Sequence, residues 1–277
     1  MIDYAFYNGI FAPYDAMTIP ISDRAFFFAD AVYDVLIGHG KGVHNVPQHL
    51  DRLNKNAKEI GLDFTLSEDY FTEITDKLVE LSCHDCFSIY VQLSASGIRR
   101  SHLRTSPDVN ILITLTGAQI PELPEKISAI TIPDRRYDFC NIKTVNLLPA
   151  VLSVEMAVKR GADIAIFESG GWITECSHAN IFILKDGVLI TPPLSSKILP
   201  GITRDTLIRL ALKKGIPTIE RQISKDEIHE ADAVLITSTT HFLRICNRID
   251  EVACSLKDEK TVLELFSLLR DNFLNLA

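Results

Sequence analysis

The sequence predicts a protein of two domains in the mixed α/β and α+β class. The chain has 277 residues, enough for two domains that each bury a core. Some segments repeat apolar residues with helical spacing, and others alternate apolar with polar residues as strands do. Residues 117–125 contain two prolines and show no periodicity, which is typical of a linker. We therefore expect an N-terminal domain over residues 1–118 and a C-terminal domain over residues 119–277.

The N-terminal part contains two predicted helices and two predicted strands. The first helix covers residues 47–61, because Pro47 suits a first turn and Gly61 suits an end. The second covers residues 68–82, where apolar residues recur on one face. Residues 87–93 alternate as a half-buried strand does, and residues 109–115 predict a second strand. Residues 38–42 are rich in glycine and predict the turn of a β-hairpin.

The C-terminal part alternates predicted strands with predicted helices. The strands lie near residues 127–132, 163–168, 180–184 and 233–237. The helices lie near residues 147–160, 203–214 and 257–274. This order supports an α/β arrangement for the second domain.

Composition and charge narrow the class of protein. The net charge of −8 disfavours a nucleic-acid partner, which would require a basic face. No apolar run reaches the ~18–20 residues that span a membrane, and the first residues do not resemble a signal peptide. Six scattered cysteines then indicate reduced thiols, so we expect a cytoplasmic protein. The pair Cys83 and Cys86 has no second pair at zinc spacing, and we expect no metal site.

Lys143 is a candidate catalytic residue. It lies between a predicted strand and a predicted helix, with Ile142 and Val145 beside it and Leu147 and Leu148 just after. We expect these apolar residues to bury the neighbouring backbone. A lysine that forms a Schiff base must lose its proton, which a partly apolar setting favours. The alternative is a solvated lysine at the end of a strand.

Three further motifs supply parts of a pyridoxal phosphate site. Glu175 is a carboxylate of the type that pairs with the pyridine nitrogen of this cofactor. Residues 201–205 predict a helix start, where Thr203 could cap the helix and Gly201 would leave backbone N–H groups open to a phosphate. The hydroxyl run of residues 237–240 follows a predicted strand and is a second candidate phosphate site. A loop, a plain helix start and a Ser/Thr turn are the respective alternatives.

The order and spacing of these motifs resemble the fold-type-IV pyridoxal phosphate enzymes, which include D-amino acid and branched-chain aminotransferases. The resemblance covers residues 6–9, 23–24, 28–34, 49–53, 141–148, 174–175, 201–205 and 237–240. It implies a smaller N-terminal and a larger C-terminal domain, with pyridoxal 5'-phosphate in the cleft between them. It also implies a homodimer.

The resemblance assigns roles to particular residues. It implies that Lys143 forms the Schiff base with the cofactor and that Glu175 pairs with the pyridine nitrogen. It further implies that the phosphate is held by a set of side-chain and backbone groups, namely Arg52, Ile202, Thr203, Ser238 and Thr239. Arg52 suits this role because a guanidinium can bind phosphate oxygens bidentately. On a surface helix, Arg52 would otherwise be a solvated charge.

The substrate carboxylate site is predicted by the same resemblance. In D-amino acid aminotransferases, a tyrosine and an Arg-x-His pair bind the α-carboxylate, and Tyr33, Arg100 and His102 match them. We therefore expect transamination between a D-amino acid, such as D-alanine, and a 2-oxo acid, such as 2-oxoglutarate. A solvated basic loop is the alternative, since Arg99 and Arg104 lie nearby. Whether His102 serves its own or the partner subunit's site stays open.

Other functions remain as alternatives at this point. A branched-chain L-amino acid aminotransferase usually carries an Arg-Pro pair that this sequence lacks. An (R)-amine transaminase or an aminodeoxychorismate lyase-like enzyme would keep Lys143 and Glu175 with a different substrate pocket. A non-enzymatic binding protein would make both residues incidental. His178 stands where D-specific relatives tend to have small residues, and its role is open.

Overall fold

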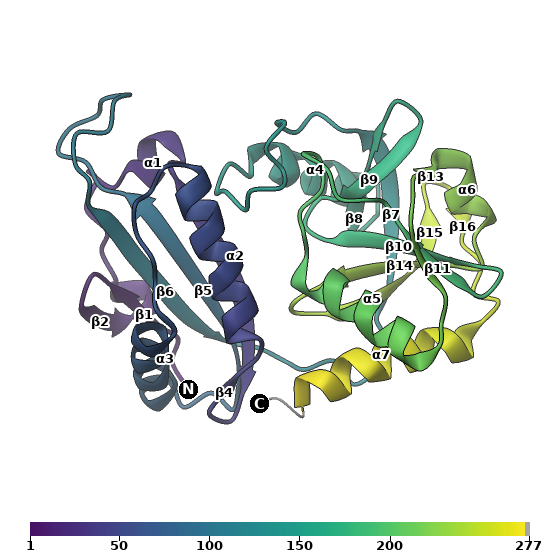
Figure 1. The fold of residues 1–277 in the computed structure, drawn as a ribbon, viewed down its shortest axis with the longest axis horizontal. Coiled ribbons are helices and arrows are strands. Elements are labelled where there is room, and N and C mark those ends of the chain that lie inside the picture. Colours follow the sequence, from purple (N-terminus) through teal and green to yellow (C-terminus); the bar gives the residue numbers. More distant parts are fainter. Residues whose placement is uncertain (275–277) are drawn as a thin grey trace. The chain divides into compact units, whose positions relative to one another are not determined.

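The computed structural model describes residues 1–274 and divides them into two compact units (Figure 1). The first unit contains Met1–Ile120, Ile142–Asn146 and Leu274, and the second contains Pro121–Asn141 and Leu147–Phe273. The change of unit at Ile120 lies two residues from the expected boundary. However, residues 142–146, which we had expected in the C-terminal domain, pack with the first unit. The cause is backbone pairing, since Tyr33 N donates to Lys143 O and Val145 N donates to Ala31 O.

The first unit is built on an antiparallel sheet with the strand order β2-β1-β6-β5-β3-β4. Its strands are β1 (Tyr4–Tyr7), β2 (Ile10–Pro13), β3 (Ala31–His39), β4 (Gly42–Val43), β5 (Cys86–Ala95) and β6 (Val109–Gly117). Its helices are η1 (Tyr14–Ala16), α1 (Arg24–Phe28), α2 (Val46–Glu59) and α3 (Glu68–Ser82).

Helices α2 and α3 cover one face of this sheet (Figure 1). Strand β5 shows why, because Phe87, Ile89 and Val91 are fully buried while the residues between them are only partly buried. Leu53 of α2 and Phe71 of α3 belong to the same core cluster as these strand residues. The alternation along β5 thus places its apolar side chains under the two helices.

The second unit contains a larger sheet with the strand order β12-β11-β10-β14-β15-β7-β8-β9-β13, and β16 pairs with β15. Its strands are β7 (Lys126–Pro133), β8 (Ile164–Ser169), β9 (Trp172–Cys176), β10 (Asn180–Lys185), β11 (Val188–Thr191), β12 (Thr218–Glu220), β13 (Ile223–Ser224), β14 (Ala233–Ser238), β15 (Phe242–Ile249) and β16 (Val252–Ala253). Its helices are α4 (Leu148–Lys159), α5 (Ile202–Lys214), α6 (Lys225–Glu230) and α7 (Glu259–Leu274).

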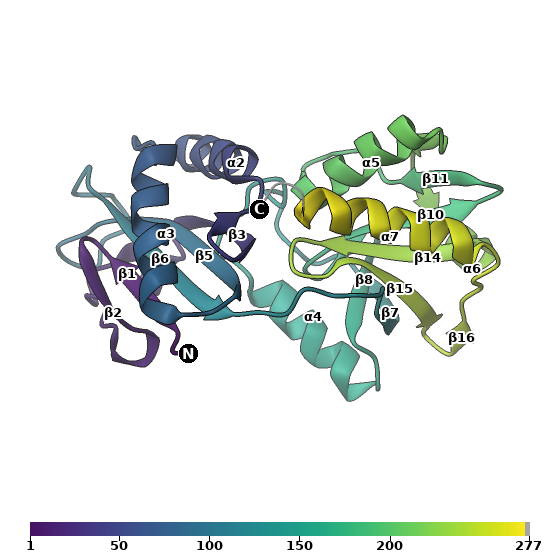
Figure 2. The same ribbon diagram turned by 90° about the horizontal axis from the view of Figure 1, so that it is seen from below.

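Both faces of this sheet are buried, in contrast to the sheet of the first unit. In Figure 2, α5 and α7 lie on one side of the strands and α4 lies on the other. Along β7, Ile127 and Ala129 join one core cluster, whereas Ile130 and Ile132 join a second cluster with Ala157 of α4. A strand buried on both faces carries apolar residues at neighbouring positions, as β7 does at Ala129 and Ile130.

The structure confirms every helix and strand that the sequence predicted, with ends that differ by a few residues. Two local expectations are wrong. Helix α5 begins at Ile202 with Gly201 as its N-cap, so Thr203 lies inside the helix and does not cap it. Ile142 is buried, but Leu147 and Leu148 are 40% and 64% exposed, so they do not bury the backbone beside Lys143.

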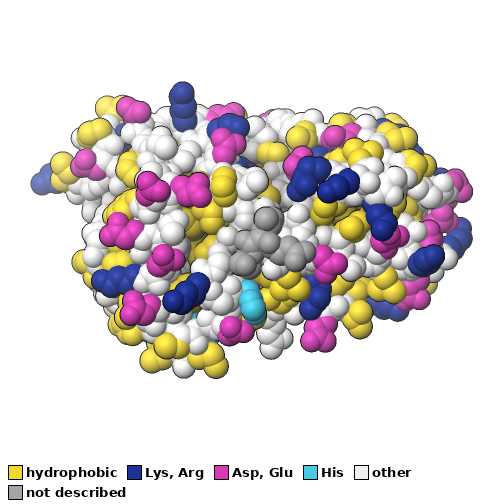
Figure 3. Space-filling view, turned by 60° about the horizontal axis from the view of Figure 1, so that its bottom comes forward, with side chains coloured by type: hydrophobic (Ala, Val, Ile, Leu, Met, Phe, Trp, Pro, Cys, Tyr) yellow, Lys and Arg dark blue, Asp and Glu magenta, His cyan; other side chains and the backbone are white. Residues whose placement is uncertain are grey.

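The surface and the helices carry two further observations. On the face shown in Figure 3, acidic and basic side chains are interspersed. Within residues 1–274, no helix is both long enough and apolar enough to cross a membrane.

Candidate functional site

Lys143 lies in a short extended segment that pairs with the beginning of β3. Thr144 forms an isolated bridge with Val32, and Tyr33 N donates to Lys143 O over 2.9 Å. The Lys143 Nζ lies 4.4 Å from the centre of the Tyr33 ring. The backbone pairing therefore holds two predicted site residues, Lys143 and Tyr33, next to each other within the first unit.

Arg52 is held by a buried carboxylate that the sequence analysis did not single out. Its Nε and Nη2 donate to the two carboxylate oxygens of Asp34 over 2.8 and 2.6 Å. His49, one turn earlier on α2, bonds Asp34 Oδ1 through Nδ1 over 2.8 Å. Arg52 is 9% exposed and Asp34 is fully buried. This bidentate pair fixes the orientation of the guanidinium.

Electrostatics explain why this cluster is stable. Burial opposes the charge on Asp34, but the Arg52 charge and the hydrogen bond from His49 outweigh it and hold the pKa of Asp34 well below its usual range. Burial also lowers the pKa of His49, against the raising effect of Asp34. A neutral His49 that donates from Nδ1 satisfies Asp34 without adding charge. Arg52 and Asp34 then form a pair with no net charge.

Glu175 is the next-to-last residue of β9 in the second unit and is surrounded by hydrogen-bond donors. Its Oε2 accepts from Asn180 Nδ2 over 3.0 Å and from Leu199 N over 3.1 Å. Its Oε1 accepts from Arg136 Nη1. Glu175 is 5% exposed, so these donors replace the water that a carboxylate needs to stay charged.

Arg136 is shared between two carboxylates. Its Nη2 and Nε bond Asp134 over 2.8 and 3.1 Å, and its guanidinium also lies 4.3 Å from the centre of the Phe167 ring. Burial opposes the charge on Arg136, but the hydrogen bonds to Asp134 and the charge of Glu175 outweigh it and raise the pKa of the guanidinium. Two carboxylates on one arginine give Asp134, Arg136 and Glu175 a net charge of about −1 at neutral pH.

Gly201 lets the start of α5 approach Glu175. A Cβ atom at this position would lie 2.0 Å from Asn180 Oδ1, so no larger residue fits without displacing Asn180. Asn180 Nδ2 donates to Leu199 O over 2.9 Å as well as to Glu175. No side chain caps the N-terminus of α5. The first N–H groups of this helix, at Ile202 and Thr203, therefore form a potential anion site close in sequence to the groups that hold Glu175.

The hydroxyl run at the end of β14 contains unsatisfied polar atoms. The hydroxyl oxygens of Thr237 and Ser238 are buried and have no hydrogen-bond partner. Ser238 is the last residue of β14, and Thr239 lies in the turn that follows. Buried hydroxyls without partners are unusual in folded proteins, because each costs free energy unless a ligand or water satisfies it. The structure thus leaves a place for hydrogen-bond acceptors at this turn.

Arg100 and His102 are exposed residues of the loop between β5 and β6. The Arg100 guanidinium lies 5.2 Å and the His102 ring 5.3 Å from the centre of the Phe28 ring. Arg104 does not share their exposure, because it bonds Asp30 and Gly61 O. Among the arginines of this loop, Arg104 is thus engaged in structure while Arg100 is exposed. His178 is likewise exposed and bonds Ser177.

Within each unit, the structure brings several predicted residues together. Lys143 and Tyr33 are neighbours in the first unit, and Glu175 is tied to the start of α5 in the second. The sequence analysis missed the supporting residues Asp34, His49 and Arg136. Of these, His49 had a signal, because His49 and Arg52 are three residues apart on one helix face. Arg136 follows a predicted strand in an irregular segment, where its partner could not be inferred.

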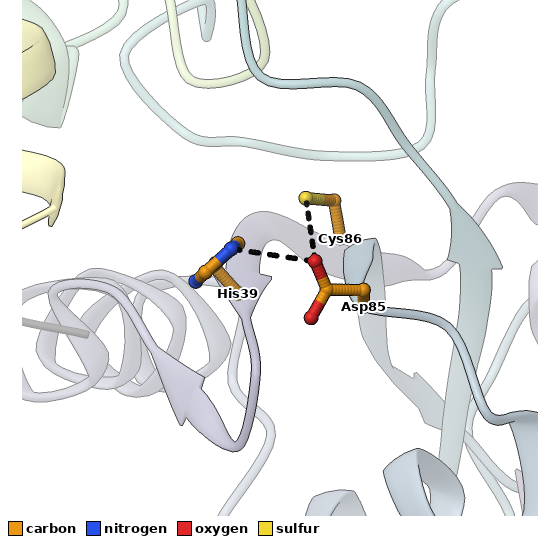
Figure 4. A group of neighbouring side chains, drawn as sticks. All are labelled: His39, Asp85 and Cys86. Carbon is orange, nitrogen blue, oxygen red and sulfur yellow. Dashed lines mark hydrogen bonds and ion pairs between the residues drawn. The ribbon is translucent and has the colours of Figure 1, made fainter.

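A second cluster of polar side chains lies at the other end of β3. Figure 4 shows His39 and Cys86 beside the Asp85 carboxylate, with His39 Nε2 and Cys86 Sγ 3.4 and 4.0 Å from Asp85 Oδ2. The Asp85 side chain is 80% exposed, and the group within residues 1–274 comprises only these three potential ligands. Tetrahedral zinc sites of the structural type require four protein ligands. We assign no metal site to this cluster.

Comparisons with known proteins identify the family to which the chain belongs. Residues 31–249 match the family model of class IV amino-transferases. The chain is 32% identical over 239 residues to the D-alanine aminotransferase of Staphylococcus aureus (strain MW2), covering 85% of each protein. It is 34% identical to the D-alanine aminotransferase of Listeria monocytogenes (serotype 1/2a, strain 10403S), covering 85% of this chain and 83% of that protein.

A solved structure supports the fold. The branched-chain amino acid aminotransferase of Thermobaculum terrenum, in its pyridoxal phosphate form, superposes with a TM-score of 0.86. The match covers 99% of this chain and 94% of that one, at 22% sequence identity. With the match to the family model over most of its length, the chain belongs to the class IV aminotransferases and has the fold-type-IV architecture.

Proposed function

We propose that this aminotransferase transfers the amino group of a D-amino acid, such as D-alanine, to a 2-oxo acid, such as 2-oxoglutarate. As a class IV aminotransferase, the protein uses pyridoxal 5'-phosphate. The observation that carries the proposal is the placement of Tyr33 beside Lys143 in a chain whose curated relatives are D-alanine aminotransferases. Tyr33 belongs to the set of carboxylate-binding residues expected of a D-specific enzyme.

The residues present fit this cofactor. Buried hydroxyls without partners at Thr237 and Ser238 suit a phosphate, as does the uncapped start of α5. The surplus negative charge around Glu175 suits a protonated ring nitrogen. When bound, pyridoxal phosphate supplies an aldehyde that accepts the amino group and a ring that stabilises the electrons left on the substrate α-carbon.

Lys143 is the proposed proton carrier of the reaction. Its free Nζ removes the proton from the substrate α-carbon and later returns a proton, so one base performs both transfers. The pairing of its backbone with β3 fixes the position from which Nζ acts. Tyr33 lies against this amine, so the proposed base and one of the proposed carboxylate-binding residues are neighbours.

Glu175 is the proposed partner of the ring nitrogen. Its carboxylate is held by Arg136, Asn180 and Leu199 N, and it therefore does not rotate away when a ligand binds. Because Asp134 shares the charge of Arg136, Glu175 retains negative charge for a cationic partner. Holding that cation lowers the energy of the state in which the α-carbon has lost its proton.

The phosphate is proposed to bind Arg52, the N–H groups of Ile202 and Thr203, and Ser238 and Thr239. The contributions are chemically complementary, since a guanidinium supplies charge while the helix start and the hydroxyls supply hydrogen bonds. The Asp34 carboxylate orients Arg52 for this role.

Tyr33, Arg100 and His102 are proposed to bind the substrate carboxylate. Fixing the carboxylate decides which face of the α-carbon turns its hydrogen towards Lys143, and this selects D over L. A carboxylate bound from the opposite side would present the hydrogen of the L-enantiomer to the same base. Stereochemistry therefore depends on where the carboxylate-binding groups lie.

The test is a half-reaction on purified protein loaded with pyridoxal phosphate, followed by absorbance without any 2-oxo acid. D-alanine should convert the cofactor to its amino form, and L-leucine should not. Conversion by L-leucine alone would replace the D-specific assignment by a branched-chain one. Reaction with neither would move the lyase and amine-transaminase alternatives forward.

We also propose that the enzyme is a homodimer. Helix α4 carries exposed apolar side chains along its length, among them Leu148, Leu152 and Val158, which are 64%, 58% and 62% exposed. An apolar helix surface of this kind is typical of a protein interface. Light scattering after size-exclusion chromatography should give about 62 kDa, twice the 31.0 kDa of one chain.

A further inference from the structure

The loop that carries Arg100 and His102 has no regular secondary structure of its own. We call residues 96–104 the carboxylate loop. Both residues are exposed and contact the Phe28 ring with their side chains. A loop without ladder hydrogen bonds samples several conformations unless side chains fix its backbone. A site that selects one enantiomer requires a loop with a fixed conformation. The residues that fix this loop are therefore expected to affect carboxylate binding.

Arg24 of α1 binds the backbone of this loop directly. Its Nη1 donates to Ser101 O, and its Nη2 donates to His102 O over 3.2 Å. Its Nε donates to Asp30 Oδ2 over 2.8 Å, and its guanidinium lies 4.6 Å from the centre of the Phe28 ring. Arg24 is 5% exposed and uses all three nitrogens in these contacts. A single buried side chain thus sets two consecutive carbonyls between Arg100 and Leu103.

Asp30 joins Arg24 to the far end of the carboxylate loop. Arg104 donates to both carboxylate oxygens of Asp30 and, through Nη1, to Gly61 O over 2.9 Å. Burial opposes the charge on Asp30, but the hydrogen bonds from Arg104 and Arg24 outweigh it and keep its pKa below the usual value. Two arginines on one largely buried carboxylate form a network that is stronger than an isolated surface ion pair.

Hydrogen bonds fix helix α1 to the sheet, and they therefore also fix the backbone position of Arg24. Asp23 caps α1 by accepting from Ala25 N over 2.9 Å. Its other carboxylate oxygen accepts hydrogen bonds of 2.8–3.0 Å from Tyr7, Ser94 and Asn110. These three residues belong to three different strands.

Gly97 allows the close approach of the loop to Arg24. A Cβ atom at Gly97 would lie 3.2 Å from Arg24 Cγ and from Ser22 O, which is tighter than ordinary contact. Arg24 and Asp30 therefore bond the loop near its middle and at Arg104 near its end.

We propose that Arg24, Asp30 and Arg104 are positioning residues for the substrate carboxylate, acting by holding the carboxylate loop. The inference rests on the proposed function, since it takes Arg100 and His102 as carboxylate-binding groups. Arg24 bonds the loop backbone, and Asp30 joins Arg24 to Arg104 at the end of the loop. These contacts leave the side chains of Arg100 and His102 available. Loosening this network lets the loop move and weakens carboxylate binding, while the proton transfer at Lys143 continues.

The main test is Asp30→Asn, which keeps the shape of the side chain and removes the charge between the two arginines. We expect the KM for D-alanine to rise about tenfold with a much smaller change in kcat, as for an interaction made equally before and during the reaction. The inhibition constant of D-lactate, a carboxylate without an amino group, should rise by a similar factor. Absorbance of the bound cofactor and its affinity should not change.

Two further variants make the result specific. Arg104→Gln removes one of the two arginines and leaves the contacts of Arg24. The KM for D-alanine and the inhibition constant of D-lactate should therefore rise by only about threefold. Asp51→Asn is the matched control, because Asp51 forms an exposed pair with Lys55 on α2 and lies outside the network. It should leave the KM and the D-lactate constant unchanged.

Wild-type KM and D-lactate inhibition in a folded Asp30→Asn variant would overturn the proposal. If Asp30→Asn does not fold, the KM and the D-lactate inhibition constant of Arg104→Gln test the proposal, and wild-type values would overturn it. If the wild-type enzyme rejects D-alanine and uses an L-amino acid, the proposed function fails. The network is then judged on the KM of that L-amino acid, and an unchanged KM in Asp30→Asn overturns it as well.

Discussion

Two buried carboxylates in this molecule are paired with arginines, yet their charges balance differently. Asp34 in the first unit bonds one arginine and one neutral histidine, so Arg52 and Asp34 cancel. Glu175 in the second unit shares Arg136 with Asp134, so that group keeps one negative charge. The first arrangement orients an arginine, and the second keeps a carboxylate charged. The same residue types are thus arranged to suit the proposed anion-binding role of Arg52 in one unit and the proposed cation-binding role of Glu175 in the other.

The comparison first predicts a difference in stability. Asp34→Ala leaves Arg52 without its carboxylate in a buried site, which costs about 3–5 kcal/mol. Urea unfolding should show this loss for the first unit. Asp51 forms an exposed ion pair on α2, the helix that also carries Arg52. Asp51→Ala should therefore cost less than about 1 kcal/mol of stability. Equal losses for the two variants would mean that the Asp34 pair does not stabilise the fold.

Glu175→Gln should instead affect the reaction. The variant keeps hydrogen-bonding capacity but removes the charge that we propose pairs with the cofactor ring nitrogen, so we expect kcat to fall by about 10²–10³. Its free energy of unfolding should change less than that of Asp34→Ala, since Arg136 keeps Asp134. The control is Glu251→Gln in the exposed turn between β15 and β16. A kcat within threefold of wild type would contradict the role of Glu175.

Gly201→Ala tests whether the residues that hold Glu175 also affect the affinity for the cofactor. The new Cβ atom displaces Asn180, which loosens Glu175 and the start of α5 together, and we expect about tenfold weaker cofactor binding. Fluorescence titration of the apoenzyme measures this affinity. The combination with Asn180→Ala should show a smaller additional loss, because the clash is already removed. Fully additive losses would show that Asn180 does not transmit the effect.

The smallest expected effect is a pH dependence in the first unit. Burial, with a smaller contribution from nearby His49, lowers the pKa of His44 from 6.5 to about 4. Between these values the unfolded chain takes up a proton that the folded protein excludes, so stability is full above pH 6.5 and is lost as the pH falls towards 4. Because solvent partly screens the group, we expect His44 to contribute on the order of 1 kcal/mol to this loss.

His44→Gln should therefore flatten the stability profile between pH 7 and pH 4.5, measured by urea unfolding. The control is His39→Gln, a partly exposed histidine at the end of β3. An unchanged slope in His44→Gln would contradict the assigned pKa.

The sequence predicted the elements with regular periodicity and missed those without it. Helices α2 and α3 and strand β7 have apolar patterns that belong to one structure type, and their positions were correct. Strand β3 was not predicted, although it carries Tyr33 and Asp34 and pairs with the Lys143 segment. Its partners in β5 and at Lys143 are distant along the chain, from His39 with Cys86 to Tyr33 with Lys143, so no local pattern indicates the pairing.

The candidate site shows the same limit. The residues that match family motifs were found, and their roles remain proposals. The residues that support them depend on tertiary contact: Asp34 becomes a partner of Arg52 only when β3 and α2 pack. Arg104 looked like one of several basic residues, and only its bonds to Asp30 distinguish it from Arg100.

Lys143 is the residue on which every proposed step depends. The most direct measurement is reduction of the cofactor-loaded enzyme with borohydride, followed by peptide mass mapping of the modified lysine. We predict that the cofactor is attached at Lys143. Attachment at a different lysine, such as Lys197 in the second unit, would contradict the proposed role of Lys143 and the site built around it.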